Sequence, residues 1–147
     1  MSVIHSFCYP VTLTPGEKRG RFTVTFKDLP EAITWGDGVD DALLRAADCL
    51  EEAIAGRIRR GDDIPEPSQA RKRQRLAPVP AAMASKAALY LAMREADITK
   101  MDLARRLGCD EKEVRRLLDP RHPSKLPHIQ HALAALGKQL VVGLRAA

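Results

Sequence analysis

Residues 103–118 read Leu-Ala-Arg-Arg-Leu-Gly-Cys-Asp-Glu-Lys-Glu-Val-Arg-Arg-Leu-Leu, and their spacing predicts two short helices joined by a tight turn. Ala104 is small enough to lie where a second helix crosses the first, and Gly108 tolerates the positive φ that the turn needs. Val114 returns a branched apolar side chain to the crossing. The remaining apolar positions at helical spacing are Leu103, Leu107, Cys109 and Leu117. This pattern is typical of a helix-turn-helix.

Both predicted helices begin with capping residues. Thr99 can cap the first helix with Asp102 at its third position, and Asp110 directly follows the turn and can cap the second helix. The outward face of the second helix then carries Glu111, Lys112, Arg115 and Arg116. A helix with an apolar inner face and a basic outer face can enter the DNA major groove, so we expect DNA binding. The alternative is a helical hairpin that only packs a core.

Charge divides the 147-residue chain into two parts of opposite sign. Residues 1–63 hold 8 Lys+Arg and 11 Asp+Glu, a net charge of −3. Residues 64–147 hold 16 and 8, a net charge of +8, which gives the whole-chain value of +5. A basic half suits a polyanion, whereas phosphate would repel an acidic half. The sequence therefore predicts two small domains with different partners.

The front half predicts a hairpin followed by a long helix. Residues 6–13 are rich in strand-forming side chains, and residues 21–26 alternate apolar and polar positions with period two. Pro10 indicates that the first of these strands lies at a sheet edge. The segments 28–31 and 34–38 are expected to form a loop, so the fold class is α+β with two or three strands.

The helix predicted over residues 40–60 has its basic end before Gly61, which should stop it. Its apolar stripe is expected to be Leu43, Ala47, Leu50, Ile54 and Ile58. Four prolines then bracket a basic run at residues 71–75, within a connector over 71–81. This connector is either a linker or a short strand with a charged edge, and either a phosphate contact or a solvated segment.

The back half, residues 82–147, is expected to be an all-α domain with a short terminal strand. Helices are predicted over 82–96 and 126–136, on either side of the helix-turn-helix. The loop between the motif and the last helix is basic, and Arg121 and Lys125 are its expected phosphate contacts. Residues 139–144 are β-like and need a pairing partner, for which a second copy of the chain is the natural choice.

The sequence gives little support for a catalytic site or a metal site. The cysteines at 8, 49 and 109 form no metal pattern and are expected to be small apolar side chains in a reducing compartment. His128 and His131 lack a third ligand, and the carboxylates do not converge as a metal-dependent nuclease requires. With no signal peptide or membrane span recognised, we expect a cytoplasmic protein without a cofactor that is not an enzyme.

Six segments spread along nearly the whole chain carry a family resemblance: Phe-Lys-Asp-Leu-Pro-Glu-Ala at 26–32, Thr-Trp-Gly-Asp at 34–37, the segment 61–68, and the back-half segments 102–108, 116–125 and 135–138. In these segments the chain resembles the HicB-type antitoxins of bacterial toxin–antitoxin pairs.

The resemblance implies a function for each half. It implies that residues 1–70 have a reduced RNase H-like fold and bind a small basic RNA-cleaving toxin of the HicA type. It also implies that residues 82–147 repress the operon promoter as a dimer or higher oligomer. Acidic front-half side chains are the expected toxin contacts: Asp28, Glu31, Asp37, Glu51 and Glu52. The alternative is a stand-alone helix-turn-helix regulator with a sensory front domain.

Overall fold

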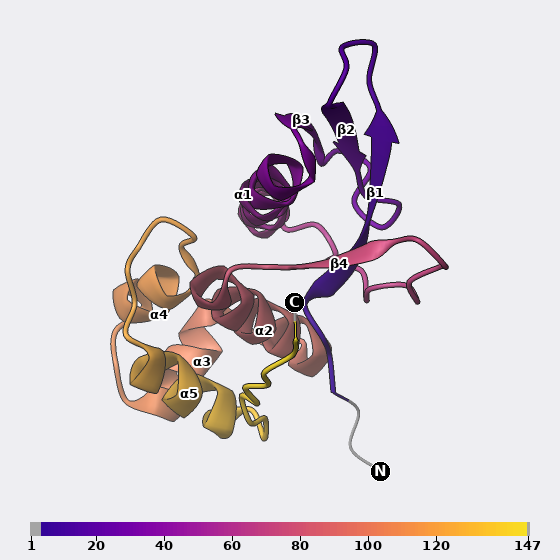
Figure 1. Ribbon diagram of the computed structural model, residues 1–147. Coiled ribbons are helices and arrows are strands. Elements are labelled where there is room, and N and C mark those ends of the chain that lie inside the picture. Colours follow the sequence, from indigo (N-terminus) through magenta and orange to yellow (C-terminus); the bar gives the residue numbers. More distant parts are fainter. Residues whose placement is uncertain (1–3, 147) are drawn as a thin grey trace. The chain divides into compact units, whose positions relative to one another are not determined.

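The structure, a computed structural model, describes residues 4–146 and has an α+β fold (Figure 1). The chain divides into two compact units, residues 1–84 and 85–147, and each is described by itself. In chain order the elements are β1 (Cys8–Pro15), β2 (Arg21–Thr25), β3 (Ile33–Asp37), α1 (Val39–Arg60), β4 (Arg75–Pro78), α2 (Ala81–Ala96), α3 (Lys100–Leu107), α4 (Glu111–Leu118) and α5 (Leu126–Ala135).

Unit 1 is built on an antiparallel sheet in the order β3-β2-β1-β4, and α1 packs on it beside β3 (Figure 1). The predicted hairpin is β1–β2. The prediction that β1 is an edge strand was wrong, because β1 lies inside the sheet. Its first half pairs only with β4 and its second half only with β2. Pro10 lies in the first half, so its missing N–H interrupts no ladder with β2.

The loop predicted over residues 34–38 was also wrong, because residues 33–37 form the strand β3. Gly36 looked like a turn residue, but the structure uses it for close packing. A Cβ at Gly36 would lie 2.5 Å from the backbone of Ala42 in α1. Glycine therefore allows α1 to approach the sheet, a role that a strand glycine often has.

The same close approach explains the buried face of α1. The helix buries Ala42 and Ala46 together with Leu50 and Ile54, whereas Leu43 and Ala47 of the predicted stripe are only partly buried. The sheet comes so close at the start of α1 that only small side chains fit against it. Ala42 and Ala46 therefore occupy the buried face there, and Leu43 lies beside that face. The predicted stop is confirmed, with Gly61 in the left-handed conformation at φ 75°.

The connector whose structure the sequence left open contains a short strand. Residues 75–78 form β4, which pairs with the first half of β1. The preceding segment 61–70 is attached to unit 1 by specific bonds, since the Tyr9 hydroxyl donates to the carbonyl of Pro65 at 2.7 Å. The sheet therefore extends beyond residue 70, the expected end of the front domain.

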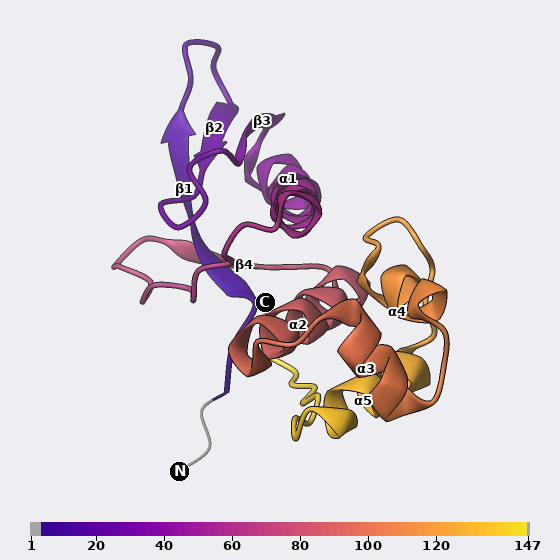
Figure 2. The same ribbon diagram turned by 180° about the vertical axis from the view of Figure 1, so that it is seen from behind.

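Unit 2 holds α3, α4 and α5 together with most of α2, and these helices lie close to one another in Figure 2. Their buried side chains form one apolar core. Its most deeply buried members are Leu89, Leu103, Val114, Ile129 and Leu133. Helices α2 and α5 match the predicted segments. The predicted terminal strand is not formed, because residues 138–146 carry neither helix nor strand. A strand needs a hydrogen-bonded neighbour, and the single chain gives this segment none.

Candidate nucleic-acid and partner surfaces

The turn between α3 and α4 has the geometry that the sequence predicts. Gly108 takes the left-handed conformation, φ 66° and ψ 36°, and the N–H of Cys109 donates to the carbonyl of Ala104 at 3.0 Å. Leu103, Ala104 and Val114 are buried, and Leu107 and Cys109 pack partly buried against the same core. The turn therefore fixes α4 against α3 through local bonds and a shared apolar contact.

Helices α3 and α4 both begin where predicted, but only α3 has a side-chain cap. Thr99 and Asp102 form a full capping box: the Asp102 N–H donates to Thr99 Oγ1 at 3.1 Å, and the Thr99 N–H donates to Asp102 Oδ2 at 3.0 Å. The hydrogen bonds lower the pKa of the Asp102 carboxyl. Asp110 is the first residue before α4, but its side chain makes no capping hydrogen bond.

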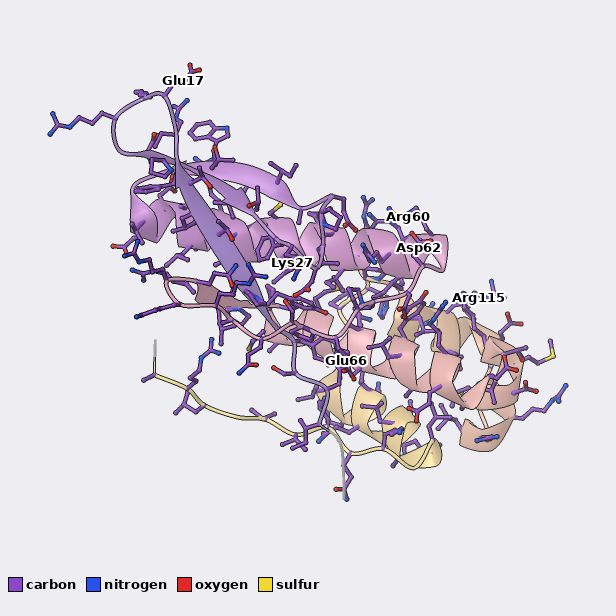
Figure 3. All side chains as sticks on the ribbon, turned by 90° about the vertical axis from the view of Figure 1, so that its right-hand side faces the viewer. Glu17, Lys27, Arg60, Asp62, Glu66 and Arg115 are labelled. Carbon is purple, nitrogen blue, oxygen red and sulfur yellow. The ribbon has the colours of Figure 1, made fainter. Side chains whose placement is uncertain are left out.

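Helix α4 separates its apolar and basic side chains cleanly. Val114, Leu117 and Leu118 face the core, while Lys112, Arg115 and Arg116 are exposed. Arg115 is seen at the surface of the helical unit in Figure 3. Glu111 is partly buried, and its Oε1 lies 3.4 Å from Arg115 Nε, so it pairs within the helix. The outer face of α4 thus carries three exposed cations towards its middle and end, and the acidic Glu111 and Glu113 in its first turn.

The end of α4 is held by a buried lysine that sequence reasoning missed. Lys86 of α2 is only 4% exposed, and its Nζ donates to the carbonyls of Arg116 and Leu117, each at 3.0 Å. It also donates to Ser124 Oγ at 2.8 Å. Burial lowers the pKa of the Lys86 ammonium. The one hint in the sequence is a charged residue inside an alanine-rich helix.

Through Ser124 the same lysine holds the basic loop after α4. Ser124 Oγ is also 3.2 Å from the carbonyl of Arg116 and 3.2 Å from His122 Nδ1. Arg121 and Lys125, the predicted phosphate contacts, are exposed on this loop. The end of α4 and the following loop are therefore both hydrogen-bonded to the buried Lys86 ammonium. The exposed cations of α4 and of the loop project from this hydrogen-bonded backbone.

Two of the five predicted toxin contacts, Asp28 and Glu31, are held by hydrogen bonds within unit 1. Asp28 accepts hydrogen bonds from both the N–H and the hydroxyl of Ser68, at 2.9 and 3.0 Å. Glu31 makes a two-pronged pair with Arg57, at 2.6 and 3.0 Å, and this bond lowers the pKa of the Glu31 carboxyl.

The other three predicted acids lie on β3 and α1. Asp37 Oδ1 accepts from Arg21 Nε at 3.3 Å. Glu51 is partly buried and Glu52 is exposed, and within residues 4–146 neither has an ion-pair partner. Glu52 is therefore the one of the five that is both exposed and unpaired within that range.

An exposed tryptophan on β3 is a second feature that sequence reasoning missed. Trp35 is 42% exposed, and its ring is stacked by Arg21 at 3.9 Å and by Arg45 at 5.0 Å, measured from guanidinium carbon to ring centroid. Ile33, two residues earlier on the same face of β3, is also exposed. Had residues 33–37 been recognised as a strand, their alternation would have placed both side chains on one face. Tryptophan and arginine are the residues most enriched in binding hot spots.

The charge difference between the halves depends on where the chain is divided. Unit 1 contains twelve Lys+Arg and twelve Asp+Glu, because the basic run at 71–75 belongs to it. Unit 2 contains twelve Lys+Arg and seven Asp+Glu, a net charge of +5. The acidic excess thus belongs to residues 1–63 and not to the whole first unit.

Neither metal-binding nor membrane-spanning features emerge from residues 4–146. That range holds no cluster of three or more His, Cys, Asp or Glu side chains suited to a metal ion. None of its helices has the length and apolarity needed to cross a membrane. The three cysteines are free thiols, each partly buried.

Comparison with known proteins gives a consistent result over both units. Residues 8–88 match the model of a family described as a HicB-like antitoxin of bacterial toxin–antitoxin systems. An antitoxin HicB of Escherichia coli is 39% identical over 132 residues, which cover 90% of this chain and 95% of that protein. Similar proteins named antitoxin HicB come from Photorhabdus laumondii, 36% identical over 97% of this chain and 90% of its own length, and from Pseudomonas fluorescens, 31% identical over 97% and 98%.

Proposed function

This chain belongs to the HicB-like antitoxin family of bacterial toxin–antitoxin systems, and we propose that it neutralises a HicA-like mRNA-cleaving toxin and represses its own operon. The proposal divides these tasks between the units, with toxin binding in unit 1 and operator binding in unit 2. It makes the protein a cytoplasmic regulator without catalytic activity of its own. The observation that carries the DNA-binding part is the exposed basic face of α4 on a fixed helix pair.

In this proposal α3, the Gly108 turn and α4 form a helix-turn-helix, and α4 is its recognition helix. Lys112, Arg115 and Arg116 are exposed where base edges would lie, and Glu111 orients Arg115. An arginine that makes a bidentate hydrogen bond to guanine contributes about 1–3 kcal/mol of discrimination against the other bases. The double variant Arg115→Ala/Arg116→Ala should therefore lose preference for the operator over unrelated DNA in a gel-shift titration. Unchanged operator preference would refute this role for α4.

Arg121 and Lys125, in the loop behind α4, are proposed to contact phosphates. Such contacts carry no sequence information, so their loss should weaken binding to operator and unrelated DNA alike. Each lost phosphate contact should also reduce the slope of log affinity against log salt by about 0.9. The double variant Arg121→Ala/Lys125→Ala tests this against the pair at 115 and 116. A loss confined to the operator would contradict the assignment.

The protein is proposed to act as a dimer or higher oligomer through its C-terminal segment. Val141, Val142 and Leu144 are 64, 83 and 103% exposed in the single chain. Two copies of this segment would pair their backbones and cover these side chains, and a dimer matches the paired half-sites that helix-turn-helix proteins usually bind. A chain ending at Gly137 should sediment as a monomer. If it remains a full-strength dimer, the interface lies elsewhere.

For unit 1 we propose a reduced RNase H-like fold that binds the toxin. The support is family membership together with a four-stranded antiparallel sheet and one long helix. Of the acidic candidates, Asp28, Glu31 and Asp37 would have to exchange internal partners for toxin, so Glu51 and Glu52 are the better contacts. The Trp35 surface on β3 is a further candidate.

We expect the toxin to be a small basic protein of the HicA type, and co-expression with a candidate followed by affinity purification tests the pairing. The antitoxin should co-purify with it and suppress its RNA cleavage. The variants Glu51→Gln/Glu52→Gln should slow association and make it less salt-dependent, as exposed charges at an interface rim do. If residues 85–147 bound and inhibited the toxin while residues 1–84 folded but did not, the proposed division of tasks would be wrong.

A further inference from the structure

The basic run in unit 1 is an ordered turn, and not a loose connector. The N–H of Gln74 donates to the carbonyl of Arg71 at 3.0 Å, which closes a turn over residues 71–74. The Gln74 side chain braces this turn, because its Oε1 accepts from the N–H of Arg71 at 2.8 Å. Its Nε2 donates to Thr12 Oγ1 of β1 at 3.1 Å, which ties the turn to the sheet.

The cations of this turn are free to meet an external anion. Arg71, Lys72, Arg73 and Arg75 are all exposed, and none of them forms an ion pair with another residue in 4–146. Figure 2 shows the segment that enters β4 as a loop projecting from the sheet. Four like charges within five residues repel one another, so an ordered turn that gathers them has an electrostatic cost that a bound polyanion would offset.

The backbone of the turn adds a second, independent observation. Arg73 has φ 76°, the left-handed conformation that non-glycine residues seldom adopt. Glycine or asparagine would take this position at lower cost, yet the chain places an arginine here. Residues kept in unfavourable conformations cluster where they serve a binding function, and this one presents a guanidinium at the tip of the turn.

We propose that the turn over residues 71–74 is a second DNA-contacting element, which binds the phosphate backbone of the same duplex that α4 occupies. This inference rests on the proposed operator binding by unit 2. Chain connectivity supports DNA as the occupant: Gln74, the last residue of the turn, lies eleven residue steps before Ser85, so it stays within about 40 Å of the start of unit 2. A tethered phosphate site acts at high effective concentration once α4 is on the duplex. Unit 1, otherwise acidic, gains attraction to DNA at this one place.

The test compares two variants of equal net charge in the full-length protein. Arg71→Gln/Lys72→Gln removes two cations from the turn, and Lys18→Gln/Arg19→Gln removes two exposed cations from the β1–β2 turn, whose position Glu17 marks in Figure 3. Affinity for operator and unrelated duplexes is measured by fluorescence anisotropy from 50 to 200 mM salt. Two lost phosphate contacts should reduce the salt slope by about 1.8, so the wild-type advantage should shrink about twelvefold across this range. The control should keep the wild-type slope.

A third variant tests whether the ordered conformation of the turn matters in addition to its positive charge. Gln74→Ala keeps all four cations but removes the hydrogen bonds to Arg71 and Thr12, and we expect it to bind DNA about threefold more weakly. Wild-type affinity in this variant, or equal slopes in the two charge variants, would overturn the inference. So would a turn variant that loses toxin or RNA binding but keeps DNA binding. If the wild type binds no duplex, or Arg115→Ala/Arg116→Ala leaves operator preference intact, the proposed function itself fails.

Discussion

Replacing Lys86 by methionine should destabilise unit 2 by a predictable amount. The ammonium donates to three acceptors: the carbonyls of Arg116 and Leu117, and Ser124 Oγ. Without the lysine, the Arg116 carbonyl still accepts from the Asp119 N–H at 3.3 Å and from Ser124 Oγ. Ser124 Oγ also lies 3.2 Å from His122 Nδ1. The Leu117 carbonyl is the acceptor left alone. An orphaned buried carbonyl costs about 1–3 kcal/mol, and the lost charged bonds add to this. Removal of the buried charge itself is favourable and offsets part of the loss.

We therefore expect Lys86→Met to lose about 2 kcal/mol, which corresponds to about 8–16 °C in melting temperature for a unit of this size. Circular dichroism at 222 nm on the full chain measures it, because the α-helices dominate that signal. Lys100→Met is the matched control, since Lys100 is exposed at the start of α3. If both variants melt within about 2 °C of each other, desolvation of the ammonium cancels its hydrogen bonds and the reasoning fails.

The pH dependence provides a second check on the same residue. Burial lowers the pKa of Lys86 in the folded protein below its ordinary value of 10.5. Between these two pKa values the unfolded chain binds more protons, so the stability of the wild type rises with pH. The rise ends near pH 10.5, and Lys86→Met should lack it. Equal pH slopes for wild type and variant above pH 8 would show that the ammonium is not desolvated.

Three further substitutions test the fold. Gly36→Ala places a Cβ 2.5 Å from the backbone of α1 and should cost unit 1 about 2–3 kcal/mol in urea unfolding, whereas Gly143→Ala, with open space around it, should not. Thr99→Ala removes the α3 capping box and should cost about 1 kcal/mol, measured as a lower denaturation midpoint of the helical signal. Arg57 lowers the pKa of Glu31, so their pair stabilises at neutral pH and is lost as pH falls through the folded pKa. Glu31→Gln should lose less than about 1 kcal/mol at pH 7, and the difference from wild type should vanish in acid.

Features that depend on a few neighbouring residues were predictable from the sequence. The Thr99 cap, the left-handed Gly108 and the buried Val114 all follow from spacing within twenty residues, and the structure has each of them. Helix capping and helical periodicity are local effects, so a single sequence contains the information they need. The exposed cations of α4 follow from the same periodicity, because the buried positions determine the outward ones.

Features that depend on distant contacts were not predictable. Gly36 indicated a turn because its partner, the start of α1, becomes a neighbour only in the folded sheet. The role of Lys86 was not recognised, since its acceptors lie thirty or more residues away in the sequence. The internal partners of Asp28 and Glu31 were hidden for the same reason. A charge count shows which groups exist but not which of them are already paired.

The C-terminal segment, residues 138–146, is proposed to form a strand only when two copies of the chain pair. In the single chain Leu140 packs partly buried against the core of unit 2, while Val141, Val142 and Leu144 are exposed to water and the backbone forms no strand. Pairing with a second copy changes both at once, which makes strand formation and dimerisation a single event in our proposal. Operator affinity then depends on protein concentration, because only the dimer presents two α4 helices to paired half-sites. Loss of the segment should therefore weaken operator binding even though every proposed DNA-contacting residue is retained.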